Sequence, residues 1–275
     1  MLHNSLDNQI IVFAKKLRAE KKSAVIIEIY LACYEMLEQD NIEAYLNFKN
    51  LVKKHYQAVL EDELKGLLGL LINFATAKIN KGEYAIFLQE SFELYELGLY
   101  SKALFNDGLL SPFIFKNIVF IASKLKKYEW AEKFVEENKN KLAKNYQTNF
   151  INYNKAIIFF NEKKYSKTWE LLAKIQLEDL HFELDLRRML VCCYFEQGEL
   201  DLLDYQLTNF KSYIEGHKAK LGPKYYNYVN FIRFTKIWSN LDKNDISRCE
   251  NIITEFNNTE QVAEREWLTN KMRIK

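Results

Sequence analysis

Apolar residues recur along most of the chain at steps of three and four, the spacing that places them on one face of a helix. A clear early example is the stripe formed by Ala24, Ile27, Leu31, Tyr34 and Leu37. No stretch shows sustained alternation of apolar and polar residues between two turn signals, so we predict no strand. The pattern therefore predicts an all-α protein that opens with a helix over about residues 6–20.

The breaks between the predicted helices are short and carry recognisable capping residues. Ser111 followed by Pro112 indicates a helix start, because proline lacks an amide hydrogen that the first helical residue does not need. Gly82 and Gly198 each follow a helical run and precede an acidic residue. That is typical of a glycine that ends a helix in the left-handed conformation before the next helix begins.

One turn pattern precedes six of the predicted helices. A polar residue or glycine and one further residue lead to an apolar anchor that opens an amphipathic helix, most clearly in Lys126, Lys127 and Tyr128. Successive anchors are 42, 44, 37, 35 and 46 residues apart. Two helices and their turns make a unit of about 34 residues, which loop insertions lengthen. The spacing predicts about six consecutive helix pairs, anchored at Ile42, Tyr84, Tyr128, Tyr165, Leu200 and Ile246.

These units resemble degenerate tetratricopeptide repeats, whose pattern has a small residue and aromatics in the first helix and Ala and Phe in the second. The helix-opening Trp, the first-helix Gly and the repeat-ending Pro of that pattern are missing. The resemblance implies a right-handed α-solenoid in which residues 1–275 form one domain, either complete or as part of a longer array. In the Tyr128 unit the matching positions hold Phe115, Ile118, Val119, Ala122, Ala131 and Val135.

The stretch from Leu110 to Asn138, together with the closing run from Ala263 to Leu268, also resembles a group of uncharacterised bacterial helical-repeat proteins. In that group such repeats form the C-terminal part of a longer chain. The shared motifs are packing motifs and imply no activity.

Composition favours a helical protein over other fold classes. Gly occurs 8 times and Pro twice, too rarely for an all-β or a parallel α/β fold. The net charge of +2 gives no drive toward nucleic acid or an anionic membrane. The most apolar run, residues 64–75, is short and contains Lys65, which indicates a buried helix and no membrane span. Neither nucleic acid nor membrane is therefore expected as a partner.

Catalytic and metal-binding signals are absent from the sequence. It contains no GxSxG, HExxH, Walker-type or GxGxxG motif, so we predict no enzyme and no cofactor. The adjacent carboxylates Glu136 and Glu137 would point to different sides of a helix, and His181, between Leu180 and Phe182, could pack between helices. The four cysteines show no CxxC spacing and lie in apolar patterns, which favours free thiols and a cytoplasmic protein.

Candidate binding residues lie in the first helices of the units, which line the peptide groove of tetratricopeptide stacks. Alignment on the anchors gives one equivalent position to an asparagine in three consecutive units, and an amide can both donate to and accept from a peptide backbone. In the Tyr128 and Leu200 units the preceding position holds a cation, which could meet a carboxylate. In the unit between them it holds a tyrosine. Asparagine occurs 25 times in the chain, so a structural origin of this repetition stays open. The candidates are Asn73, Asn117 and Asn154, with Lys116, Tyr153 and Arg188.

Charge is segregated in the second half of the chain. Residues 139–168 contain seven Lys and one Glu, whereas residues 169–204 contain nine acids and three bases. Neighbouring repeats of opposite sign could attract one another, offer a dipolar surface to a partner, or form solvated faces. The acidic stretch interrupts the continuous basic strip that nucleic acid would need.

An aromatic cluster follows in residues 225–238, where Phe231, Phe234 and Trp238 share one helical face. Such a stripe indicates a core more often than a binding surface. A helix over residues 260–275 could cover it, because a terminal repeat needs a polar outer face.

These observations predict a non-catalytic scaffold or adaptor that binds an unknown protein or peptide along the concave face of a solenoid. The alternative is a regulatory sensor domain whose groove takes a small ligand or a signalling peptide. A thermal-shift screen separates the two, because a small ligand raises the melting temperature by mass action.

Overall fold

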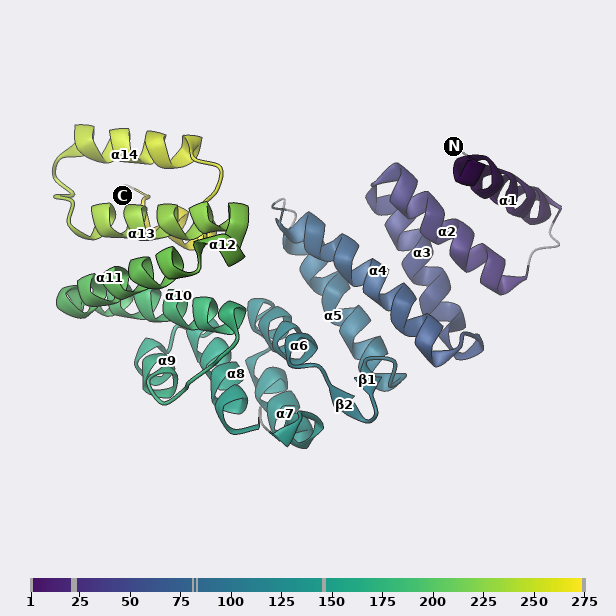
Figure 1. Cartoon of the computed structure of the whole chain (residues 1–275), viewed down its shortest axis with the longest axis horizontal. Helices are drawn as coiled ribbons and strands as arrows, with labels where there is room; N and C mark the ends of the chain where they lie inside the picture. The colour runs from purple at the N-terminus through teal and green to yellow at the C-terminus, as the bar shows by residue number, and fades with distance from the viewer. Residues whose placement is uncertain (1, 21–23, 81, 83, 145–146, 274–275) are drawn as a thin grey trace. The chain divides into compact units, whose positions relative to one another are not determined.

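The computed structural model describes residues 2–20, 24–80, 82, 84–144 and 147–273, and most of them lie in helices joined by short loops (Figure 1). The all-α prediction is therefore confirmed. The chain divides into two compact units, Met1–Asn154 and Lys155–Lys275, with the division inside one helix.

The first unit begins with α1 and continues with helices that pack in consecutive pairs, α2 on α3, α4 on α5 and α6 on α7. A short hairpin interrupts the series between α5 and α6. Its elements are α1 (Leu2–Ala19), α2 (Val25–Gln39), α3 (Ile42–His55), η1 (Tyr56–Ala58), α4 (Glu61–Asn80), α5 (Tyr84–Tyr100), β1 (Phe105–Asn106), β2 (Leu109–Leu110), α6 (Pro112–Lys124), α7 (Tyr128–Asn138), η2 (Lys139–Lys141) and the start of α8 (Gln147–Asn161).

In the second unit α10 packs on α9 and on α11, and α11 in turn packs on α13. The chain then passes through α14 to α15, which contacts α13. The elements are the end of α8, α9 (Tyr165–Leu172), α10 (Leu180–Gln197), α11 (Leu200–Gly216), α12 (Lys218–Leu221), η4 (Gly222–Lys224), α13 (Tyr225–Ser239), α14 (Ile246–Asn258) and α15 (Arg265–Lys271).

Each of the six predicted anchors is the first residue of a helix, namely of α3, α5, α7, α9, α11 and α14. Two positions before five of these anchors the backbone has a positive φ, at Asp40, Gly82, Lys126, Lys163 and Gly198. Such a residue closes the preceding helix, because it turns the next amide groups back toward the last carbonyls.

The turn before Tyr128 shows the hydrogen bonds of this closure. The Lys126 amide donates to the Ser123 carbonyl (3.0 Å) and the Lys127 amide donates to the Ala122 carbonyl (2.9 Å). The same two bonds recur before Tyr165 and before Leu200. The shared sequence pattern thus reflects one repeated helix-ending motif, a Schellman turn.

The prediction that the chain has no strand is wrong for one hairpin. In β1 and β2, Phe105 pairs with Leu110 and Asn106 with Leu109. The two turn residues, Asp107 and Gly108, both have positive φ, as a tight hairpin turn requires. Strands of two residues are too short to show alternation, so only the Asp-Gly dipeptide could have indicated them.

The core of the second unit contains the predicted aromatic stripe. Phe231 and Phe234 are fully buried and Trp238 nearly so, which confirms a core role. Leu268 of α15 belongs to the same cluster, so α15 covers the stripe as expected, although the helix is shorter than residues 260–275. The four cysteines are buried free thiols. His181 is exposed, contrary to the expected packing between helices, because it lies in the first turn of α10.

Among the described residues, no helix is both long enough and apolar enough to cross a bilayer.

Candidate functional site

Five of the six predicted groove residues lie in the first unit, and three of them are on the first helices of successive pairs. Asn73 of α4 and Asn117 of α6 are exposed, and Lys116 is half-buried. A side-chain hydrogen bond links Asn117 to Tyr95 of α5. Burial raises the pKa of Tyr95 to about 12, and this bond opposes the rise. The Asn117 amide thus reaches solvent while α5 limits its movement.

The other two candidates in this unit, Tyr153 and Asn154, do not line an accessible groove. Both are fully buried in α8. The Asn154 side-chain nitrogen donates to the Phe150 carbonyl within the helix (2.8 Å), and the Tyr153 ring lies 5.5 Å from that of Phe150. The prediction failed because the spacing that Asn154 shares with Asn117 fixes only its position on its own helix. The spacing does not show which other residues pack against that position.

Arg188, the predicted groove residue of the second unit, does meet carboxylates, and both belong to this chain. Its guanidinium forms an ion pair with Asp185 one turn earlier in α10 (3.1 Å) and another with Glu264, which directly precedes α15. The side chains of Arg188 and Glu264 are 22% and 16% exposed. Both carboxylates that Arg188 contacts are therefore the chain's own, and its contact with a ligand carboxylate stays a prediction.

Glu196, two turns further along α10, contacts α15 itself. Its two oxygens accept hydrogen bonds from Trp267 Nε1 (2.7 Å) and Lys271 Nζ (2.6 Å). Tyr165 of α9 also hydrogen-bonds Glu196, and burial together with this carboxylate raises the pKa of Tyr165. With its side chain 13% exposed, Glu196 is a nearly enclosed acceptor whose charge Lys271 balances.

Helix α13 forms hydrogen bonds with the main chain of residues 261–271. The side-chain amide of Asn230 donates to the main-chain carbonyl of Gln261 (2.8 Å), and Trp238 Nε1 donates to the main-chain carbonyl of Lys271 (3.1 Å). The Ala263 amide donates to the main-chain carbonyl of Asn227 (2.9 Å). Main-chain hydrogen bonds of this kind hold a segment whatever its side chains.

Aromatic rings of α10 and α13 also contact this part of the chain. The Trp267 ring lies 5.1 Å from Phe195 of α10, nearly perpendicular to it, and 6.1 Å from Phe231 of α13. Edge-to-face contacts at these distances are favourable. Residues 261–272, hereafter the C-terminal segment, therefore lie against both α10 and α13.

The register of the contacts gives the direction of the C-terminal segment. On α10, Arg188 contacts Glu264, and Glu196, further along the helix, contacts Lys271. On α13, Trp238, near the end of the helix, also contacts Lys271. The C-terminal segment thus runs in the same direction as α10 and α13. These helices precede the anchored helices α11 and α14, so they occupy the place of the first helices of their pairs.

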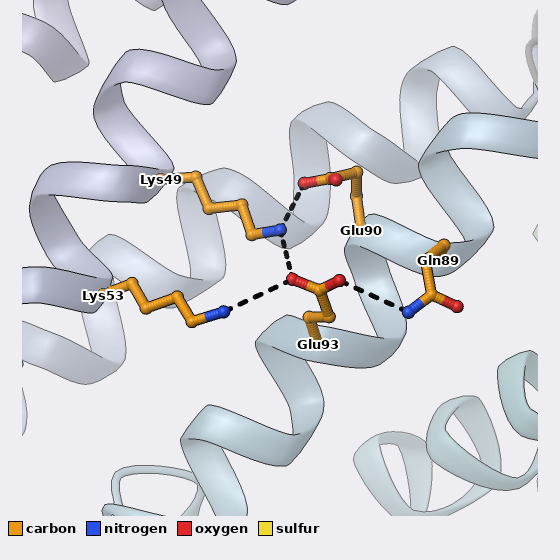
Figure 2. A network of polar contacts seen from close by, with 5 residues as sticks. All are labelled: Lys49, Lys53, Gln89, Glu90 and Glu93. Carbon is orange, nitrogen blue, oxygen red and sulfur yellow. Dashed lines mark hydrogen bonds and ion pairs between the residues drawn. The ribbon is translucent and has the colours of Figure 1, made fainter.

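A second polar cluster lies in the first unit between α3 and α5 (Figure 2). Lys49 Nζ lies 2.5 Å from Glu90 and 2.7 Å from Glu93, and Lys53 lies 3.6 Å from Glu93. Gln89 also donates to Glu93 (3.3 Å). The Lys49 side chain is only 6% exposed.

This Lys49 cluster is self-contained. The hydrogen bond from Lys49 lowers the pKa of the Glu93 carboxyl more than its partial burial raises it. Two lysines face two glutamates, so the charges balance within the cluster. Such an arrangement joins α3 to α5 and offers no reactive group.

Neither cluster was predicted from the sequence, although each had a local signal. Lys49 follows Tyr45 by four residues and precedes Val52 by three, the spacing of the buried face of α3. Glu264, Trp267 and Lys271 likewise share one helical face. Neither pattern identifies the partner, which is 41 or more residues away in sequence.

The cysteines are poor candidates for chemistry. Burial raises the pKa of Cys33 and of Cys192, and it raises the pKa of Cys193 to about 12, so these thiols stay protonated at neutral pH. In the part of the chain that the structure describes, no three or more His, Cys, Asp and Glu side chains are placed to hold a metal ion.

None of the protein-family models, curated proteins or solved structures compared with this chain matches it.

Proposed function

We propose that the chain is a non-catalytic binding scaffold, a right-handed α-solenoid of tetratricopeptide-like helix pairs that holds peptide segments along its first helices. One observation carries this proposal. The face of α10 and α13 already holds a peptide segment, the chain's own C-terminal segment, through contacts of the kind that peptide grooves use.

The contacts on that face are of two kinds, those to the main chain and those to charged side chains. Asn230 and Trp238 bind main-chain carbonyls, which are present in every peptide. Arg188 and Glu196 bind charged side chains, which only some peptides carry. The first group supplies affinity and the second supplies selectivity.

In the first unit, α4 and α6 are the first helices that carry predicted groove residues accessible to solvent. Their exposed amides, Asn73 and Asn117, and the cation Lys116 offer the same two kinds of contact. Asn73 and Asn117 each precede the anchor of their pair by eleven residues, which supports corresponding positions on the two helices. A partner segment with a carboxylate near the Lys116 ammonium suits this face.

The test is selection of binding peptides from a displayed library with the full chain as bait. We expect selected peptides to bind the double variant Lys116→Glu, Asn117→Ala at least about tenfold more weakly, the loss of roughly one charge-assisted contact. The matched control is Lys133→Glu, which makes the same charge change on the second helix of the same pair, where Lys133 is 72% exposed.

Equal binding to the double variant and to the control would place the peptide elsewhere. A library that yields no peptide, with a small molecule that raises the melting temperature, would contradict the scaffold and favour the sensor domain.

A further inference from the structure

The C-terminal segment has the properties of a bound ligand, and the face beneath it has those of a binding site. We propose that the face of α10 and α13 binds a short helical segment of another protein that carries a carboxylate, an aromatic ring and a lysine or arginine at positions i, i+3 and i+7, and that residues 261–272 are a built-in ligand which such a segment displaces. This inference rests on the proposed function and specifies its ligand.

The first argument is the order of charges on the face. Arg188 and Glu196 are eight residues apart on α10, so they lie about 12 Å apart along the helix axis. They bind Glu264 and Lys271, which are seven residues apart. A segment bound in the opposite direction would put lysine beside arginine and glutamate beside glutamate. The face is thus selective for both sequence and direction.

The second argument is that the C-terminal segment has little stability of its own. Helix α15 has 7 residues, far fewer than an isolated helix needs in water. It begins after Glu264, a non-glycine residue in the left-handed conformation (φ 51°), which is unfavourable for the backbone. The helix therefore persists because of the face on which it lies.

The third argument is that α10 and α13 are joined without the C-terminal segment, although Leu268 and Met272 of that segment belong to the core cluster. Helix α11 packs against both α10 and α13 and so connects them. Departure of the C-terminal segment would, however, expose Phe231 and Trp238, which are buried beneath it. An open apolar face of this kind is unfavourable in water, so exchange for another segment is favoured over simple opening.

A segment from another protein fits better than the same segment from a second copy of this chain. Residues 259–264 link α14 to α15, and six residues span at most about 20 Å. The link is also tied to α13 through Gln261 and Ala263. A swap between two copies would therefore require α14 of one copy to lie within about 20 Å of this face on the other, a demand that a separate segment of another protein does not have to meet.

The test uses the full chain and a fluorescent synthetic peptide with the sequence of residues 258–273. Binding is measured by fluorescence anisotropy to the wild-type chain and to the chain variant Trp267→Ala, in which the built-in ligand has lost its ring. We expect the variant chain to bind the peptide at least about tenfold more tightly, because the built-in ligand competes less well for the face. A peptide that itself carries Trp267→Ala is the matched control and should bind neither chain.

Charge reversal makes the test specific to this face. In the Trp267→Ala background, the chain substitution Arg188→Glu should weaken binding of the unaltered peptide about tenfold. A peptide carrying Glu264→Arg should recover most of that loss on the Arg188→Glu chain and bind poorly to its parent. Equal binding of both peptides to both folded chains would overturn the proposal.

Hydrogen exchange on the wild-type chain keeps the proposal testable if Trp267→Ala fails to fold. We expect amides 265–272 to exchange at least about a hundredfold faster than those of α13, and faster still when unlabelled peptide is added in excess. Exchange of α15 at the same rate as α13 would show that the C-terminal segment leaves only on global unfolding, and would overturn the proposal. A concentration-dependent dimer abolished by Arg188→Glu would overturn it in favour of a second copy.

Failure here is distinguishable from failure of the scaffold. If α15 never leaves, yet displayed peptides still depend on Lys116 and Asn117, the scaffold function stands and the ligand of the second unit is wrong. If those peptides depend on neither residue, the groove of the first unit is wrong independently of α15.

Discussion

The two polar clusters use the same chemistry for different purposes. In the first unit Lys49 binds two glutamates, and in the second unit Glu196 binds a lysine, a tryptophan and a tyrosine. Lys49 joins α3 to α5, helices of 14 and 17 residues inside the series of pairs. Glu196 instead joins α10 to a helix of 7 residues next to the end of the chain.

The difference teaches that the effect of a buried ion pair depends on what it connects. Loss of Lys49 leaves two carboxylates between helices that cannot separate without disrupting the unit, so the penalty falls on global stability. Loss of a contact to Glu196 can be relieved by local release of α15, so the penalty falls on one segment.

The largest expected effect comes from Lys49→Ala. It should destabilise the protein by roughly 3–5 kcal/mol, as measured by urea unfolding, because it leaves two partly buried carboxylates without their cation. The control is Lys53→Ala, which removes a lysine that is 60% exposed from the same cluster and should cost at most about 0.5 kcal/mol. Similar costs for the two variants would remove the contrast between the clusters.

Glu196→Gln should have a smaller and more local effect. The neutral amide keeps the shape but loses the charge that holds Lys271, so we expect a loss of about 1–3 kcal/mol in the opening free energy of residues 265–272 by hydrogen exchange. The urea midpoint should change much less. A fall of the global midpoint as large as that caused by Lys49→Ala would show that α15 is an integral part of the core.

Acid should weaken the Lys49 cluster through Glu93. The pKa of this carboxyl is lowered in the folded state, mainly by the hydrogen bond from Lys49, so its contribution to stability is present above the ordinary value of 4.5 and is lost as pH falls through the folded value. We therefore expect wild type to be more stable than Glu93→Gln at pH 7, with the difference shrinking below about pH 4.5. A constant difference between pH 7 and pH 3 would contradict the assignment.

The smallest expected effect on stability comes from the helix-ending turn, which occurs in both units and so allows the same substitution to be compared between them. Lys126 and Lys163 have φ of 60° and 63°, a conformation that glycine adopts without strain. Lys126→Gly and Lys163→Gly should each stabilise the chain by up to about 1 kcal/mol in thermal unfolding. Glycine at exposed Lys133, inside α7, should instead destabilise by about 1 kcal/mol.

Local features of the fold could be predicted from residues close together in sequence. The six anchors, the helix-ending turns and the buried aromatic stripe of α13 all depend on contacts within a few residues or on helical periodicity. The hairpin at Asp107 and Gly108 was missed although it is local, because two residues per strand carry no periodic signal.

The candidate site shows the limit of the same reasoning. Arg188 was expected to meet the carboxylate of a ligand, and nothing near it in sequence indicates that it pairs with Glu264, 76 residues away. Asn117 and Asn154 hold equivalent positions, and yet the first is exposed and the second is fully buried.

By itself, therefore, the sequence determined where the six anchored helices begin and that the α13 stripe is a core face, because turn and helix geometry depend on neighbouring residues. Only the tertiary structure decided which element covers each face. That choice created the Lys49 cluster and placed the C-terminal segment on α10 and α13. It depends on packing between residues far apart in the chain, where many pairings satisfy the same local pattern and only the assembled core distinguishes among them.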